Sequence, residues 1–461
     1  MKGNGRTHSE PARRKFGRLL ARLGILILIG CSSSSSNAPE KENACLDMQA
    51  MELATSSSGL RQYSVYLPKG FDESNPPTAA GFPILYAFHG FYGSSTGFAM
   101  QVSGGQLCEL ADRENLIVVF PQGSFTIANE SLYKQGTPGG VDSGFISSWN
   151  FLPPEYYGPD FQANTVDGLE VCNLDQLKDD AEAGGYVDQG IYPPLPGCNV
   201  WDKLGCSWTT CNNDVEFILE LQDHVMARYR GDPERQHLLG FSNGSMLVFN
   251  LACEHPSRFT SAVANSGTTA SDQNGEIGML CNRERLTEDS VSLLMLSGAN
   301  DYTVPIRDRD YPGPIGTGTP VYNYFLKMSA AAEQLAISME CRAFERTWPA
   351  DYQDALGAME CFSYYHCGKD QADSVEYCVW GLDPESAIAS GDFGGANHVY
   401  LGCDYGGGFC VERSVQGDIT YAPGQEGYPE CLLNNRSPWG CSTDKGTEFI
   451  WEFLNKDHAA G

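Results

Sequence analysis

The chain has 461 residues, of which 41% are hydrophobic, so it is long enough to bury a large core. Its 58 Asp and Glu residues outnumber its 30 Lys and Arg residues, which gives a net charge of −28 at pH 7. Such a surface repels polyanions, which argues against nucleic acid and anionic membrane surfaces as partners.

The N-terminus predicts a bacterial lipoprotein signal peptide over residues 1–30. Several basic residues precede a short apolar run that is too brief to span a bilayer and ends in Leu28-Ile29-Gly30-Cys31. Cys31 would then be lipidated, and residues 31–58 would form a Ser-rich tether. An ordinary cleaved signal peptide is the alternative. We therefore expect an extracytoplasmic protein that is lipid-anchored to a bacterial membrane, at the outer membrane or cell surface, or is secreted.

The cysteines also favour an oxidising compartment. Of the 17 cysteines, 16 follow Cys31, and none has the paired C-x-x-C spacing of a zinc site. We predict eight disulfides and no metal site. The acidic run at residues 179–182 lacks the spacing of a calcium loop and is interpreted as solvated charge.

Strands and helices alternate along the chain. Hydrophobic patterns predict strands at 60–67, 83–88, 116–120, 236–241, 259–265, 291–297 and 375–380, and helices at 98–113, 214–229, 245–253, 320–337 and 447–454. This alternation predicts an α/β fold with a mainly parallel sheet and helices on both faces. One domain is expected over residues 59–461, with two long disulfide-stapled insertions at about 124–211 and 382–441.

The motif Gly240-Phe241-Ser242-Asn243-Gly244 has the form G-x-S-x-G. An apolar strand precedes it and a helical segment follows it, as in the sharp turn that exposes the serine nucleophile of an α/β-hydrolase. Ser242 is therefore the predicted nucleophile. The backbone N–H of Asn243 is predicted to bind the oxyanion, next to the N-terminus of the following helix.

A serine hydroxyl needs a base and an acid that orients the base. In this fold the acid and then the histidine follow the serine along the chain, with the histidine after the last strand. Asp301 follows shortly after the strand at 291–297 and is the predicted acid. His398 lies on a Gly-flanked loop and is favoured as the base over His366, which precedes the last predicted strand.

The second oxyanion N–H is expected from the loop that begins with His89-Gly90. Phe91 is preferred, with Tyr92 as the alternative. Together these residues, in this order, predict the α/β-hydrolase fold.

The segments RQYSVYLP, PILYAFHGFYGSS, LIVVFPQG, HLLGFSNGSM, AVANSG and LMLSGANDYTVP occur in this order over residues 60–303. With the final helix, they resemble the bacterial polyhydroxybutyrate depolymerase and feruloyl esterase-like family. The resemblance implies the same Ser242, Asp301 and His398 triad in a secreted esterase. It also implies that Trp149 lies near the substrate groove. Val399-Tyr400-Leu401-Gly402 stands where the family usually has Thr-Trp-Pro-Gly.

The sequence thus predicts a monomeric serine esterase that works through an acyl-enzyme without a cofactor. Its expected substrates are polyesters such as polyhydroxyalkanoate, or phenolic and feruloyl esters. Trp149, Phe91, Tyr92 and Tyr400 are predicted to form an aromatic acyl groove. The alternatives are an acyltransferase or peptidase of the same fold, and an inactive, surface-displayed binding protein on a hydrolase scaffold.

Overall fold

The structure is a computed structural model. It describes residues 44–127, 145–150, 212–269, 289–299, 328–381, 398–405 and 443–456, apart from 57, 58, 92, 357 and 370, together with short strands and the single residues 281, 286, 301 and 304. The chain divides into two units, Met1–Glu42 and Asn43–Gly461, and the described residues all belong to the second. The predicted signal peptide and Cys31 lie outside the described residues.

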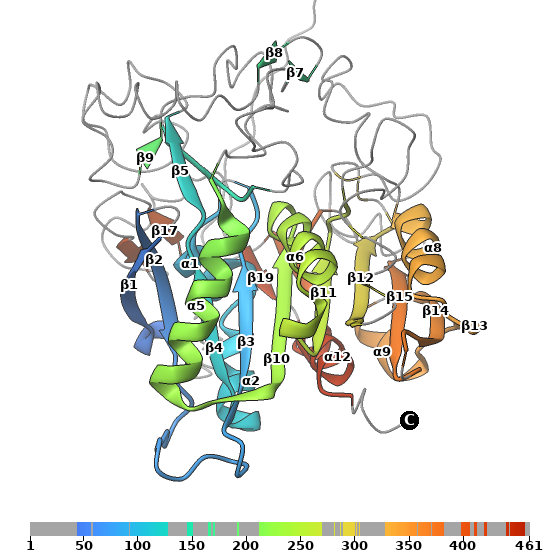
Figure 1. The fold of residues 1–461 in the computed structure, drawn as a ribbon, viewed down its shortest axis with the longest axis horizontal. Helices are drawn as coiled ribbons and strands as arrows, with labels where there is room; N and C mark the ends of the chain where they lie inside the picture. Colours follow the sequence, from blue (N-terminus) through green and yellow to red (C-terminus); the bar gives the residue numbers. More distant parts are fainter. Residues whose placement is uncertain are drawn as a thin grey trace, which may run out of the picture. The chain divides into compact units, whose positions relative to one another are not determined.

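A ten-stranded sheet has the spatial order β1-β2-β4-β3-β10-β11-β12-β15-β14-β13 (Figure 1). The strands are β1 (Gln49–Thr55), β2 (Gly59–Tyr66), β3 (Phe82–Phe88), β4 (Ile117–Pro121), β10 (Gly231–Phe241), β11 (Ser261–Asn265), β12 (Ser292–Gly298), β13 (Ala343–Thr347), β14 (Glu360–Cys367) and β15 (Asp373–Trp380). In this spatial order, the six neighbouring strands β4, β3, β10, β11, β12 and β15 run parallel to one another. At the two margins, β2 pairs antiparallel with β4, and β14 pairs antiparallel with β15.

Every residue of β3, β4, β11 and β12 is buried, as expected for strands that are covered on both faces. The apolar runs that predicted these strands are therefore explained by burial of both faces of each strand. The strand order, with helices on both faces, is that of the α/β-hydrolase fold, and this prediction is confirmed.

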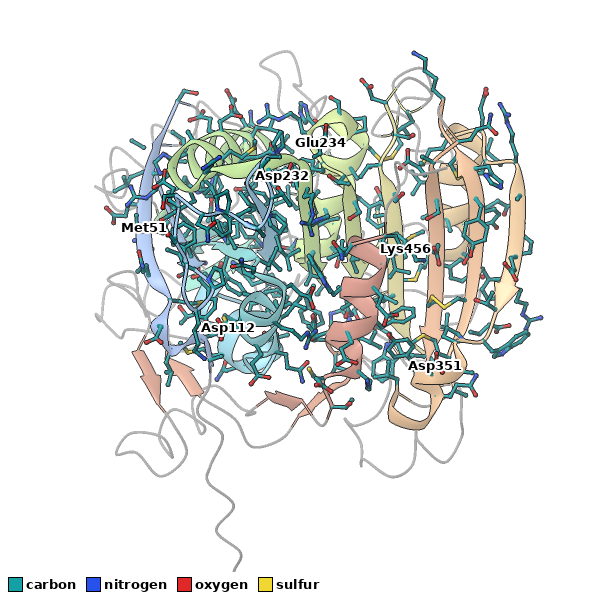
Figure 2. The ribbon with its side chains drawn as sticks, turned by 90° about the horizontal axis from the view of Figure 1, so that it is seen from below. Met51, Asp112, Asp232, Glu234, Asp351 and Lys456 are labelled. Carbon is teal, nitrogen blue, oxygen red and sulfur yellow. A yellow bond between two sulfur atoms is a disulfide. The ribbon has the colours of Figure 1, made fainter. Side chains whose placement is uncertain are left out.

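Helices form a layer on each side of the sheet (Figure 1). One layer holds α5 (Asp214–Tyr229), α6 (Asn243–Glu254) and α8 (Met328–Ser338); the other holds α2 (Gln106–Glu114), α9 (Ala350–Leu356) and α12 (Lys445–Leu454). Figure 2 shows the two layers from below, with Asp112 on α2, Asp351 on α9 and Lys456 just beyond α12. Each layer packs its apolar side chains against one face of the sheet in a separate buried cluster. No helix in the described part of the chain has both the length and the apolar character needed to cross a bilayer.

The predicted helix at 98–113 is two elements instead of one, and a short helix precedes them. Helix α1 (Ser95–Gly97) continues into the π-helix η2 (Phe98–Val102), and α2 starts only at Gln106. Gly104 and Gly105 lie between them with φ values of 59° and 83°, a left-handed conformation that interrupts a right-handed helix. Because both residues are glycine, the chain can turn here at little steric cost.

Three strands of the ten-stranded sheet were not predicted: β1, β13 and β14. They form the two antiparallel margins of the sheet, where one face or edge meets solvent and long apolar runs are absent. The 3-10 helix η1 (Ala44–Asp47) and β1 also occupy the end of the predicted tether. The boundary predicted at residue 58 is therefore too late, because folded structure begins by Ala44.

The insertions contribute short strands to smaller sheets. β5 (Ser124–Ile127), β6 (Phe145–Ser148) and β9 (Ile191–Tyr192) form one sheet, and β7 (Thr165–Val166) pairs with β8 (Leu169–Glu170). In the second insertion, β16 (Cys403–Tyr405) pairs with β19 (Trp439–Cys441) and β17 (Cys410–Glu412) with β18 (Ile419–Tyr421).

The described residues include four disulfides: Cys45–Cys108, Cys253–Cys281, Cys341–Cys367 and Cys361–Cys378. Cys403 is disulfide-bonded as well. The first bond ties η1 to α2, and the last joins neighbouring strands β14 and β15. The predicted staples of the first insertion, Cys172, Cys198, Cys206 and Cys211, lie outside the described residues.

Candidate active site

The predicted nucleophile lies at the carboxyl end of β10, the upper end of the strand in Figure 1. The chain passes from β3 to β4 on one side and then to β10 on the other, so the strand order reverses between β3 and β10. In open α/β sheets, ligands bind beyond the carboxyl ends of the strands at such a reversal. The fold therefore places Ser242 where a binding site is expected.

Ser242 has φ 54° and ψ −119°, a strained conformation between the strand and α6. The glycines on either side allow this turn. A Cβ on Gly240 would lie 2.4 Å from the Gly244 carbonyl oxygen, and a Cβ on Gly244 would lie 2.5 Å from the carbonyl oxygens of Phe88 and His89. The turn is thus closely packed backbone against backbone, which explains why the motif needs glycine at both positions.

Three side chains meet at this turn. Ser242 Oγ lies 2.7 Å from His398 Nε2, and His398 Nδ1 lies 2.9 Å from Asp301 Oδ2. Because a carboxylate only accepts hydrogen bonds, Nδ1 carries the hydrogen toward Asp301. That leaves Nε2 as an acceptor for the Ser242 hydroxyl hydrogen. The structure brings together the three residues that the sequence singled out, in one chain of hydrogen bonds.

Asp301 is held independently of the histidine. Its carboxylate accepts a hydrogen bond from the Val304 backbone N–H at 3.0 Å and one from the Ser297 hydroxyl at 3.4 Å. The Asp301 side chain has no exposed surface, whereas that of His398 is 18% exposed. The acid is therefore shielded from water while the base remains accessible, which strengthens the electrostatic interaction between them.

His366, the alternative base, lies beside the amino ends of the parallel strands, opposite the ends that carry Ser242 and Asp301. Strand β14 runs antiparallel to β15, so its last residues lie beside the start of β15 at Asp373. His366 is exposed, with φ 55°, at an irregularity in this pairing. It is therefore far along the strands from the carboxyl ends that carry Ser242 and Asp301.

The predicted oxyanion loop is fixed by His89, which is buried. The Gly123 backbone N–H donates to His89 Nε2 at 2.9 Å, so the ring hydrogen is on Nδ1 and is donated to the Gly90 carbonyl oxygen at 2.8 Å. The same carbonyl accepts the Gly93 N–H at 2.9 Å. Phe91 lies inside this turn and is half-buried, and Tyr92 lies outside the described residues.

Trp149 does not line a substrate groove, which corrects the prediction. Its side chain is fully buried in the core, where its indole N–H donates to the His89 carbonyl oxygen at 2.8 Å. Its backbone N–H donates to Asn243 Oδ1 at 2.6 Å, and its carbonyl accepts from Asn243 Nδ2 at 3.3 Å. Trp149 therefore supports the oxyanion loop and the residue next to the nucleophile from behind. The sequence did not reveal this use of the Asn243 side chain.

Tyr400 is also part of the core instead of the groove. It is fully buried, its ring packs edge-on against Phe98 at 5.8 Å, and its hydroxyl lies 3.4 Å from Thr447 Oγ1. Burial raises the pKa of this phenol, which keeps it neutral. The tyrosine two residues after His398 therefore holds the base loop against α12.

The loop of the base is bound to the end of β11. Asn265 Nδ2 and Ser266 Oγ both donate to the Val399 carbonyl oxygen at 3.1 Å, and the Leu401 N–H donates to Asn265 Oδ1 at 2.9 Å. These two residues were not predicted as site residues. Within the described residues, no group of three or more His, Cys, Asp or Glu side chains is arranged to hold a metal ion.

No protein-family model matches the chain, and no curated protein matches it in sequence. Among solved structures, it is similar to an acetyl xylan esterase from Aspergillus awamori, with 11% identity, a TM-score of 0.38, and coverage of 72% of this chain and 92% of that one. It is also similar to a mutant feruloyl esterase module from Clostridium thermocellum complexed with sinapinate (12% identity, TM-score 0.31, 65% and 77% coverage). A third is an S-formylglutathione hydrolase from Staphylococcus aureus (14% identity, TM-score 0.30, 55% and 80% coverage).

Proposed function

We propose that this chain is an exported serine esterase that hydrolyses carboxylic esters through an acyl-enzyme. The observation that carries the proposal is the hydrogen-bonded chain from Ser242 Oγ through His398 to the buried Asp301, next to a strained strand-to-helix turn. A scaffold that only binds its ligand would not need this strained serine or the shielded acid behind its base.

In the proposed reaction, Ser242 Oγ attacks the ester carbonyl carbon while His398 Nε2 takes the hydroxyl proton. The carbonyl electron pair moves onto oxygen, and the backbone N–H groups of Asn243 and Phe91 stabilise this oxyanion. Collapse of the tetrahedral intermediate breaks the ester bond, and the leaving alcohol takes the proton from Nε2. Water then attacks the acyl-enzyme by the same steps, which releases the acid and restores Ser242.

The proposed substrates are polyesters such as polyhydroxyalkanoate, or phenolic and feruloyl esters, on the strength of the sequence resemblance. With Trp149 and Tyr400 in the core, the aromatic acyl groove rests on Phe91 and Tyr92. The test is hydrolysis of p-nitrophenyl butyrate, methyl ferulate and a polyhydroxybutyrate film by the purified protein and by Ser242→Ala. We expect turnover of at least one ester by the wild type and none by the variant. Equal turnover by both proteins would refute the proposal, and binding without turnover would favour the inactive scaffold.

We further propose that Cys31 is lipidated and anchors the protein at the outer membrane or cell surface. Replacing Cys31 with alanine removes the only thiol in the Leu28-Ile29-Gly30-Cys31 motif, so the variant should leave the membrane fraction or be mislocalised. Cell fractionation followed by immunoblotting measures this, with Ser32→Ala as a control that keeps the thiol. A Cys31→Ala variant that stays with the membranes like the wild type contradicts the anchor.

A further inference from the structure

Asn265 is the last residue of β11, the strand between the one that ends at the nucleophile and the one that leads to the acid. It is fully buried. We infer that Asn265 is a positioning residue, which sets the base against the nucleophile by binding both of their chain segments at once. The inference rests on the proposed esterase function and extends it to a residue outside the triad.

The backbone of Asn265 holds the nucleophile turn. Its carbonyl oxygen accepts the Ser242 N–H at 2.8 Å and the Ser245 hydroxyl at 2.7 Å. One atom thus binds the nucleophile itself and the first turn of α6. The strained conformation of Ser242 is therefore fixed by β11 as well as by its neighbours in the chain.

The side chain of Asn265 holds the base loop at two points. Nδ2 donates to the Val399 carbonyl oxygen, and Oδ1 accepts the Leu401 N–H. Val399 directly follows His398, so this carbonyl belongs to the first residue beyond the base. A primary amide offers a donor and an acceptor side by side, which is what these two backbone groups require. A carboxylate of the same shape offers no donor to the Val399 carbonyl.

Ser266 provides a second donor to the same carbonyl. Its hydroxyl lies 3.1 Å from the Val399 oxygen and 2.9 Å from Asn265 Nδ2. The Ser266 backbone N–H is itself bound to the Leu296 carbonyl oxygen on β12 at 2.7 Å. The base loop is therefore tied to β11 through residue 265 and to β12 through residue 266.

A competing explanation is that apolar packing alone holds the loop, since Val399, Tyr400 and Leu401 are buried. In that case the amide of Asn265 would contribute only stability. The two explanations differ in what a substitution changes. A displacement of His398 weakens proton transfer in the transition state, so kcat falls while substrate binding is kept. A loss of stability alone leaves kcat of the folded protein unchanged.

The test compares Asn265→Asp, Asn265→Ala and Ser266→Ala with the control Ser261→Ala in the full-length protein. Ser261 begins the same strand, is fully buried, and donates its hydroxyl to the Leu454 carbonyl oxygen at 2.9 Å, away from the site. Measurements are kcat and KM on p-nitrophenyl butyrate, the rate of Ser242 phosphorylation by diisopropyl fluorophosphate, and Tm.

For both Asn265 variants we expect kcat and the rate of Ser242 phosphorylation to fall about 100-fold, with KM changed less than about twofold. For Ser266→Ala we expect a fall of about three- to tenfold, because Asn265 still binds the Val399 carbonyl. Ser261→Ala should lower Tm and leave kcat within about twofold. If an Asn265 variant does not fold, Ser266→Ala decides between the two explanations: a lower kcat with an unchanged KM supports positioning, and an unchanged kcat supports stability alone.

Asn265 or Ser266 variants that lower Tm but keep the kcat and the phosphorylation rate of the wild type would overturn the inference. That result leaves the proposed function intact, because the wild type is still an active esterase. A wild type that neither hydrolyses esters nor reacts with the fluorophosphate refutes the proposed function instead. Failure of the inference and failure of the proposed function therefore give different experimental results.

Discussion

Replacing Ser242 or His398 with alanine is expected to abolish ester hydrolysis, with a loss of order 10⁶ in kcat for either change alone. The loss should be no larger for the double variant. The hydroxyl and the imidazole share one proton across a 2.7 Å contact, so neither has a function in the reaction without the other. Single-turnover and steady-state measurements with p-nitrophenyl butyrate check this expectation.

Asp301→Asn should cause a smaller loss, about 10⁴-fold in kcat. The single amide oxygen still has to accept the Val304 N–H, so the NH₂ group faces His398 Nδ1 and donates to it. The ring therefore adopts the wrong tautomer, with its hydrogen on Nε2, although it remains in place. His366→Ala is the matched control for His398→Ala, because it removes an exposed imidazole at the opposite ends of the strands from Ser242. Circular dichroism establishes that each variant is folded. If His366→Ala inactivates the protein while His398→Ala does not, the base is wrongly assigned.

The elements around the nucleophile could be predicted because local patterns determine them. Helix α5 has both of its predicted ends, Asp214 and Tyr229. Asn213 caps its start by accepting the Glu216 N–H, and Arg230 ends it in a left-handed conformation. The strand before Ser242 and the helix after it are equally local, since an apolar run, a glycine-flanked turn and a second apolar run follow one another.

Contacts between distant segments could not be predicted in this way. Aromatic residues beside a motif are compatible with a substrate groove and with the core, and only packing decides between them. Trp149 and Tyr400 were assigned to the groove for this reason and are fully buried. The hydrogen bond from Asn265 to Val399 joins residues 134 positions apart, and no periodicity or spacing in the sequence reports such a pair.

A second network beside the site joins Arg61 on β2 to Asp214 at the start of α5. Arg61 Nη2 lies 2.6 Å from Asp214 Oδ1, and both side chains are buried. Asp214 Oδ2 accepts the Asn150 N–H at 2.7 Å, and Asn150 adjoins the tryptophan that supports Asn243. The guanidinium also lies 4.0 Å from the centre of the Phe217 ring. A buried ion pair is thus part of the support beneath the nucleophile turn.

Asp214→Asn is expected to lower the free energy of unfolding by about 3–5 kcal/mol, because it removes the carboxylate that balances a buried guanidinium. Both Asp214 oxygens accept from donors, Arg61 Nη2 and the Asn150 N–H. An amide has one oxygen, so its NH₂ group must face one of these donors. That donor then meets another donor instead of an acceptor. Urea denaturation followed by circular dichroism gives the free energy.

Asp223→Asn is the matched control, since Asp223 lies on the same helix and pairs with Arg258 at the surface, with its side chain 70% exposed. This change should cost less than about 1 kcal/mol, because water screens the exposed pair and solvates either partner alone. Replacing both buried partners, Arg61→Met with Asp214→Leu, should cost less than Asp214→Asn, since no charge is then left in the core. If Asp214→Asn and Asp223→Asn lower the free energy of unfolding equally, burial of the Arg61–Asp214 pair adds nothing to its contribution to stability.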